Sequence, residues 1–184
     1  TINDPVTLPL SDSTRFSLQL NDISEDARMG WPEIRFTNNR SLFTATNENQ
    51  LQVWNARLRK KILQRNFSKA IKAFPDRNGS SILVIEDNGQ QSYSEYRMYR
   101  IALADNTLFS SAPIIESDTT MNGSFNRCDC KPDPVADNSW TCSDRSGRLW
   151  TISGPQLRQE KILTIPDRSV DYWQQDATGN SWLL

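Results

Sequence analysis

A short sequence pattern recurs four times along the chain, and it constrains the fold more than any other feature of the sequence. Each copy has a polar turn rich in Asp, Asn or Gly, then a serine, then an apolar or aromatic stretch typical of a β-strand. The marker serines are Ser41, Ser81, Ser139 and Ser181, spaced 40, 58 and 42 residues apart. The longest interval contains residues 110–134, which carry Pro, Cys and Gly and which we interpret as an inserted loop.

Three of the copies continue through a polar turn into a second apolar segment, as antiparallel hairpins do. These second segments, which are rich in β-branched and aromatic residues, begin near Leu51, Tyr96 and Arg148. Hairpins repeated at intervals of roughly 40 residues are typical of the blades of a β-propeller. The pattern predicts a mainly β, propeller-like array of about four antiparallel blades or hairpins, within a single domain covering residues 1–184.

Two of the turns share an Asp-x-x-Gly-x-x-Trp pattern, at residues 144–150 and 176–182. In this pattern Asp caps the turn, Gly takes a positive φ and Trp begins the packed strand. Both segments resemble the repeats of bacterial two-component-regulator propellers. Residues 49–55 resemble the last part of a WD40-type repeat, and the openings near Trp31 and Phe74 are similar to those of TolB-type propellers.

The resemblance spans about residues 31–184. It implies a periplasmic or otherwise extracytoplasmic bacterial domain, the sensory or scaffold part of a membrane-anchored regulator or envelope complex. The chain begins at Thr1 without an initiator Met or a signal segment, so we expect a processed or excised piece whose anchor lies elsewhere. No apolar run in the sequence is long enough to span a membrane as a helix.

The segment from Leu51 to Phe74 supports an alternative fold. Its apolar residues recur at nearly helical spacing, it is rich in helix-forming residues after Ala56, and Pro75 would end a helix there. The alternative is an α+β fold in which one basic amphipathic helix, at about residues 51–74, packs on an antiparallel sheet.

The same segment contains the strongest charge imbalance in the chain, with seven basic residues and no acid between Arg57 and Lys72. We interpret it as a docking face for an acidic partner, a phosphate-bearing ligand or an anionic membrane, or else as the solvated side of an amphipathic element. The candidate binding residues here are Arg57, Arg59, Lys60, Lys61 and Arg65. Nucleic acid is not expected, because the net charge of the chain is −1.

Three tyrosines beside a polar hairpin tip, Tyr93, Tyr96 and Tyr99, form a second candidate recognition surface. Tyrosine suits such a surface because it combines apolar area with a hydrogen-bonding hydroxyl.

The three cysteines, Cys128, Cys130 and Cys142, leave several alternatives open. Cys142 forms a disulfide with Cys128 or Cys130 in an oxidising compartment, or three thiolates and a nearby aspartate bind zinc, or all three stay reduced. We favour the disulfide and expect neither a metal nor a cofactor.

Without histidine, no Ser-His-Asp or Cys-His relay can form. An enzyme would have to depend on carboxylates such as Asp144, Asp176 or Glu86, and two of these occupy turn-capping positions. We therefore predict a non-enzymatic binding domain that recognises a protein, including a membrane protein, or a small ligand. The alternative is a periplasmic inhibitor or immunity-type protein that blocks a toxin or a hydrolase.

Overall fold

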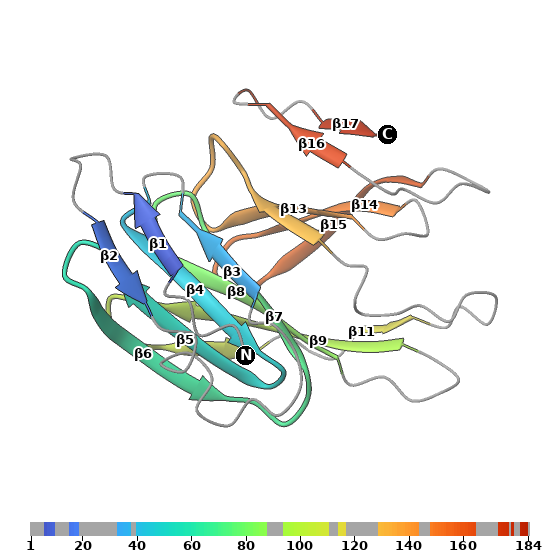
Figure 1. Cartoon of the computed structure of the whole chain (residues 1–184). Coiled ribbons are helices and arrows are strands. Elements are labelled where there is room, and N and C mark those ends of the chain that lie inside the picture. The colour runs from blue at the N-terminus through green and yellow to red at the C-terminus, as the bar shows by residue number, and fades with distance from the viewer. Residues whose placement is uncertain are drawn as a thin grey trace.

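The computed structural model describes residues 6–9, 15–18, 33–37, 40–87, 94–110, 114–116, 129–143, 148–164, 173–176, 178 and 181–183, and their regular secondary structure is entirely β-strand (Figure 1). The strands are β1 (Val6–Pro9), β2 (Arg15–Leu18), β3 (Glu33–Phe36), β4 (Leu42–Asn47), β5 (Gln50–Asn55), β6 (Lys60–Asn66), β7 (Ile71–Pro75), β8 (Ser81–Asp87), β9 (Ser94–Ala102), β10 (Leu108–Ser110), β11 (Ile114–Glu116), β12 (Asp129–Pro132), β13 (Ser139–Ser143), β14 (Arg148–Ser153), β15 (Arg158–Thr164), β16 (Trp173–Gln175) and β17 (Ser181–Leu183).

Three sheets have the topology of propeller blades, in which consecutive strands are antiparallel neighbours (Figure 1). Blade 1 has the order β3-β4-β5-β6, and blade 3 has the order β12-β13-β14-β15. Blade 2 has the order β7-β8-β9, with β10 and β11 both paired to β9. The hairpins β1-β2 and β16-β17 form two further small sheets. The predicted mainly β, propeller-like architecture is therefore confirmed.

Strands β10 and β11 are two halves of the outer strand of blade 2. Ser110 pairs with Tyr99, and Ile114 pairs with Tyr96 a few residues along the same partner, so the two halves follow each other with a small register shift. Strands β11 and β12 both fall within residues 110–134, which we expected to be an inserted loop. Residues 111–113 and 117–128 lie outside the described residues.

The alternative helix at about residues 51–74 is wrong, because this segment forms β5, β6, β7 and the turns between them. Arg59 has a φ of 52°, which no α-helix accommodates. Apolar residues that would share one helical stripe have opposite environments, since Leu51 is fully buried whereas Leu58 is 70% exposed. Pairing of β5 with β4 and of β7 with β8 overrides the local helix propensity.

Each marker serine lies at the start of a strand or directly before it. Ser81, Ser139 and Ser181 are the first residues of β8, β13 and β17, and Ser41 directly precedes β4. In each of the three blades, the residue after the innermost strand donates its backbone N–H to the backbone carbonyl of the first residue of the second strand. These bonds join Thr37 to Leu42 (3.0 Å), Asp76 to Ser81 (2.9 Å) and Asp133 to Ser139 (2.8 Å). The acceptor is the marker serine itself in blades 2 and 3, and in blade 1 it is the residue after Ser41.

Strand β8 is buried on both faces, which explains its continuous apolar run. Ile82 and Val84 belong to a cluster that includes Leu51 of blade 1. Leu83 and Ile85 point to the opposite face and belong to a cluster shared with blade 3. Because successive strand residues face opposite sides, blade 2 fills the space between its two neighbours.

Gly79, in the turn between β7 and β8, is required where blade 2 meets blade 1. Its φ is 73°, and a Cβ added there would lie 2.7 Å from Leu42 Cδ1 and 3.0 Å from Thr37 Cγ2. Only glycine fits this conformation and this close approach without strain.

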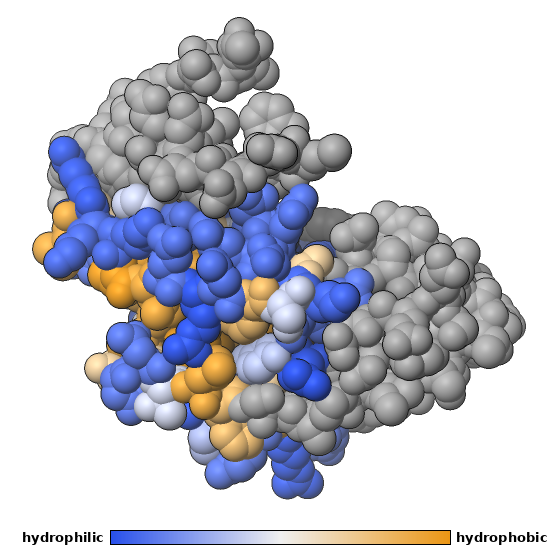
Figure 2. Space-filling model, turned by 90° about the horizontal axis from the view of Figure 1, so that it is seen from below, coloured by the Kyte–Doolittle hydropathy of each residue, from blue (hydrophilic) through white to orange (hydrophobic). Residues whose placement is uncertain are grey.

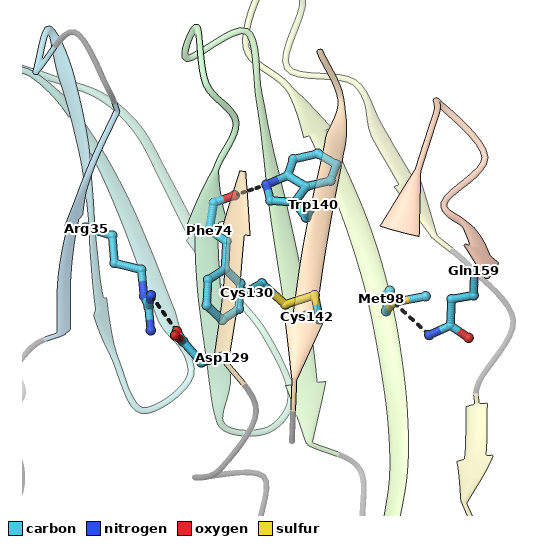
Figure 3. The surroundings of a disulfide bond; sticks show 8 residues. All are labelled: Arg35, Phe74, Met98, Asp129, Cys130, Trp140, Cys142 and Gln159. Atoms are coloured by element: carbon cyan, nitrogen blue, oxygen red, sulfur yellow. Dashed lines mark hydrogen bonds and ion pairs between the residues drawn. A yellow bond between two sulfur atoms is a disulfide. The ribbon is translucent and has the colours of Figure 1, made fainter. Parts of the chain in front are cut away.

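The core between blades 2 and 3 contains a disulfide between Cys130 of β12 and Cys142 of β13 (Figure 3). The two residues are directly paired across the strands, and both are buried. Trp140 is also fully buried, and its indole Nε1 donates to the Phe74 carbonyl of blade 2 at 3.1 Å. One of the two pairings left open by the sequence is therefore present, and it removes two of the three thiolates that a zinc site would need.

We predict that Cys130→Ala combined with Cys142→Ala lowers the free energy of unfolding by about 3 kcal/mol, because the disulfide closes a short loop and so reduces the entropy of the unfolded chain. Urea denaturation followed by tryptophan fluorescence measures the change. Cys128→Ala is the matched control and is expected to retain wild-type stability. If Cys128→Ala were as destabilising as the double variant, the Cys130–Cys142 pairing would be incorrect.

Candidate binding surface

The five predicted basic residues lie together on the outer hairpin of blade 1. Arg57 and Arg59 are in the turn between β5 and β6, and Lys60, Lys61 and Arg65 are on β6 itself. We call these five residues the basic edge. Strand β6 is the last in its sheet, and in the described part of the chain no strand pairs with its outer side.

The side chains of β6 show why this strand tolerates so many cations. Leu63 packs against the core cluster shared by blades 1 and 2, while Gln64 is exposed. Lys61 Nζ lies 5.7 Å from the centre of the Trp54 ring and donates to Gln64 Oε1 at 2.6 Å. Cations along an edge strand stay hydrated and discourage edge-to-edge pairing between copies of the same protein.

Two large apolar side chains are exposed among these cations. Leu58 is 70% and Ile62 is 41% exposed. Ile62 lies at a register shift, since Val53 pairs with Leu63 and Trp54 pairs with Lys61, which leaves Ile62 as the extra residue of a bulge. The basic edge therefore offers apolar contact area as well as positive charge. On the face seen in Figure 2, hydrophobic residues likewise reach the surface between hydrophilic ones.

The other two basic residues of the 57–72 segment lie elsewhere. Lys69 is exposed in the connection between β6 and β7, and Lys72 is half-buried on β7, the first strand of blade 2. The segment runs from the outer edge of one blade to the innermost strand of the next, so its seven cations do not form one face.

A charged cluster between the innermost strands was missed by the sequence analysis (Figure 3). Arg35 of β3 has its guanidinium carbon 4.3 Å from the centre of the Phe74 ring of β7, and its Nη1 lies 2.9 Å from Asp129 Oδ1 of β12. Arg35 also pairs with Glu33 on its own strand. Burial lowers the pKa of Lys131 on β12, Asp129 opposes this effect, and the charge of Arg35 adds to it. The cluster joins the innermost strands of all three blades.

The three tyrosines do not form one described surface. Tyr93 lies outside the described residues, and only the backbone of Tyr96 is described, in β9 opposite Asp87. Tyr99 is half-buried, and its ring centre lies 5.2 Å from that of Phe67. Its hydroxyl donates to Glu86 Oε2 at 2.7 Å, so Tyr99 takes part in an internal hydrogen bond.

Glu86, one of the carboxylates considered for catalysis, is buried and bonded within the fold. Its Oε1 accepts hydrogen bonds from the Ser68 N–H (2.8 Å), the Ser68 hydroxyl (3.0 Å) and the Lys69 N–H (3.0 Å). Burial raises the pKa of this carboxyl, but the hydrogen bonds from Tyr99, Ser68 and Lys69 outweigh it and hold the pKa below its ordinary value. A carboxylate held ionised by internal donors stabilises the fold and is poorly suited to proton transfer.

Asp176 caps its own turn, as predicted from the Asp-x-x-Gly-x-x-Trp pattern. Its Oδ1 accepts from the Thr178 N–H at 2.8 Å and from the Thr178 hydroxyl at 2.7 Å. Asp144 lies outside the described residues. Within the described ranges, no three His, Cys, Asp or Glu side chains are arranged to hold a metal ion, and no helix is long and apolar enough to cross a membrane.

No protein-family model matches the chain, and no curated protein sequence matches it. The fold, however, is similar to several solved structures. The Cps50 (Swd1) β-propeller domain of Myceliophteria thermophila is 14% identical, with a TM-score of 0.58. Dipeptidyl peptidase 4 of Porphyromonas gingivalis is 10% identical (TM-score 0.61), and an auxiliary nutrient binding protein of Bacteroides thetaiotaomicron is 9% identical (TM-score 0.52).

The matches cover 99%, 86% and 82% of this chain but only 64%, 30% and 35% of the respective structures, so the chain spans less than two thirds of each protein. At these identities the similarity defines the fold alone. The chain has a β-propeller-type fold, in agreement with the repeats in its sequence.

We predict that Glu86→Gln lowers the free energy of unfolding at pH 7 by about 2 kcal/mol, because the neutral amide offers one uncharged acceptor oxygen where the buried carboxylate offers two charged ones. Since the folded-state pKa is depressed, the contribution of the carboxylate is complete above the ordinary pKa of 4.5 and disappears as the pH falls through the folded value. The difference between wild type and variant should therefore shrink in acid. Urea denaturation between pH 3 and pH 7 measures it, and Glu160→Gln, at an exposed position, is the control. A difference that stays constant with pH would contradict an ionised Glu86.

Proposed function

We propose that this chain is a non-enzymatic, extracytoplasmic protein-binding propeller whose basic edge docks an acidic partner protein. The basic edge itself carries this proposal. It combines five cations and two exposed apolar side chains, Leu58 and Ile62, on the outer hairpin of blade 1. The charge is a local feature, because the whole chain has a net charge of −1. Local positive charge attracts and orients a partner that carries acidic groups.

The placement of the carboxylates supports a binding role rather than catalysis. The described carboxylates considered for catalysis, Glu86 and Asp176, are both occupied by internal donors. One structural neighbour is a peptidase and another is a nutrient binding protein, so the fold alone does not decide this point.

The buried disulfide supports an extracytoplasmic location, because such bonds persist in oxidising compartments. The resemblance to two-component-regulator and TolB-type repeats supports a sensory or scaffold role in a membrane-anchored bacterial regulator or an envelope complex. In that setting the partner is a protein of the envelope.

We predict that the immobilised chain retains an acidic partner from an envelope extract of its source, and that Lys60→Glu retains it about fivefold less. One exposed ion pair contributes up to about 1 kcal/mol, and reversing the charge adds repulsion. Quantitative mass spectrometry of the retained proteins measures the ratio. Arg158→Glu, at an exposed cation on the outer strand of blade 3, is the matched control and should bind like wild type.

Equal retention by wild type and Lys60→Glu would exclude the basic edge as the docking surface. Stoichiometric retention of a toxin or a hydrolase whose activity is blocked would favour the inhibitor alternative over a sensory or scaffold role.

A further inference from the structure

The backbone groups on the side of β6 that no described strand covers can be assigned to particular residues. Phe67 donates its backbone N–H to the Asn49 carbonyl at 2.8 Å and accepts from the Asn49 side-chain amide at 3.0 Å. Its backbone groups thus point toward β5. In an antiparallel ladder these groups alternate in direction from one residue to the next. Leu63 and Arg65 therefore bond toward β5, and the N–H and C=O of Gln64 point away from the sheet.

We propose, on the basis of the function proposed above, that the acidic partner binds by adding an extended segment to β6 as a fifth strand of blade 1. Main-chain hydrogen bonds to the outward groups around Gln64 hold the segment, as in other cases of strand addition. The acidic side chains of the added strand then lie beside the cations of the basic edge, and its apolar side chains contact Leu58 and Ile62.

The charges of the outer strands show why blade 1 is suited to this partner. Strand β6 carries cations and no acid, with the sequence Lys-Lys-Ile-Leu-Gln-Arg-Asn. Strand β15 of blade 3 carries both signs, as Arg-Gln-Glu-Lys-Ile-Leu-Thr. The outer strand of blade 2, β10 with β11, has no cation. Among these described outer strands, only β6 repels a copy of itself and attracts an acidic strand.

The basic edge presents charge on both faces of blade 1. Lys61 donates to Gln64, which places these two side chains on one face, while Arg65 follows Gln64 and points to the other. Because the side chains of an added strand also alternate between faces, a segment with acidic residues at both odd and even positions meets a cation on either side.

The test uses a fluorescent peptide of about ten residues, longer than β6, composed of Glu, Thr and Ile. We expect the wild-type chain to bind it in fluorescence anisotropy, with an affinity that falls as salt is added. Gln64→Pro should weaken binding at least about tenfold, because it removes the outward N–H without removing a bond to β5. Gln64→Ala is the matched control. It removes the same side chain, keeps the N–H and should bind within about twofold of wild type.

A second probe protects the test against misfolding of Gln64→Pro. The same peptide, methylated at consecutive backbone nitrogens, keeps its charge but cannot pair as a strand, and we expect wild type not to bind it. Equal binding of the methylated peptide, or equal binding by Gln64→Pro and Gln64→Ala, would overturn strand addition in favour of charge contact alone. Binding to phosphatidylserine vesicles without binding to the peptide would overturn it in favour of a membrane surface.

These experiments distinguish failure of strand addition from failure of the proposed function. If no peptide binds while capture of a protein partner remains sensitive to Lys60→Glu, strand addition is wrong and the docking surface stands. If neither occurs, both proposals fail.

Discussion

The burial of β8 on both faces is the constraint on which the rest of the structure depends. A strand with no solvent-facing side is stable only between two neighbouring sheets, so blade 2 requires blades 1 and 3. Directional contacts then fix how the blades meet. Trp140 of blade 3 donates to the Phe74 carbonyl of blade 2, and Arg35 of blade 1 covers the Phe74 ring while it pairs with Asp129 of blade 3. A hydrogen bond, a cation–π contact and an ion pair thereby connect the three blades in directions that an apolar core alone does not specify.

The blade repeat could be predicted because its signal is local. A turn residue, a serine and an alternating or continuous apolar run all lie within one hairpin, and each acts through its own backbone geometry. The alternative helix over residues 51–74 arose because Leu51, Leu58 and other apolar residues of three strands and the turns between them fall at helical spacing. Local propensity could not show that Leu51 enters the core whereas Leu58 faces solvent, because pairing with distant strands decides this.

The candidate site was predictable only in part. The run of basic residues was visible in the sequence. The turns after β5 and β6, however, divide this run, so that five cations lie on the outer edge of blade 1 and Lys72 lies on the first strand of blade 2. The Arg35–Asp129 pair had no sequence signal, since its members belong to different blades. Likewise, Cys128 and Cys130 were equivalent candidates until the register of β12 with β13 placed Cys130 opposite Cys142.

The same cations have two consequences for the basic edge. An outer strand that ends a sheet exposes backbone groups that pair readily with any other strand, and uniform positive charge suppresses this with copies of the chain. This suppression of strand pairing is selective, because the charges that repel a like-charged strand attract an incoming strand of opposite charge. A protein that protects an edge with one sign of charge therefore also defines the partner that can use that edge. Leu58 and Ile62 add to this selectivity, since exposed apolar side chains contribute nothing to repulsion and gain free energy only when a partner covers them.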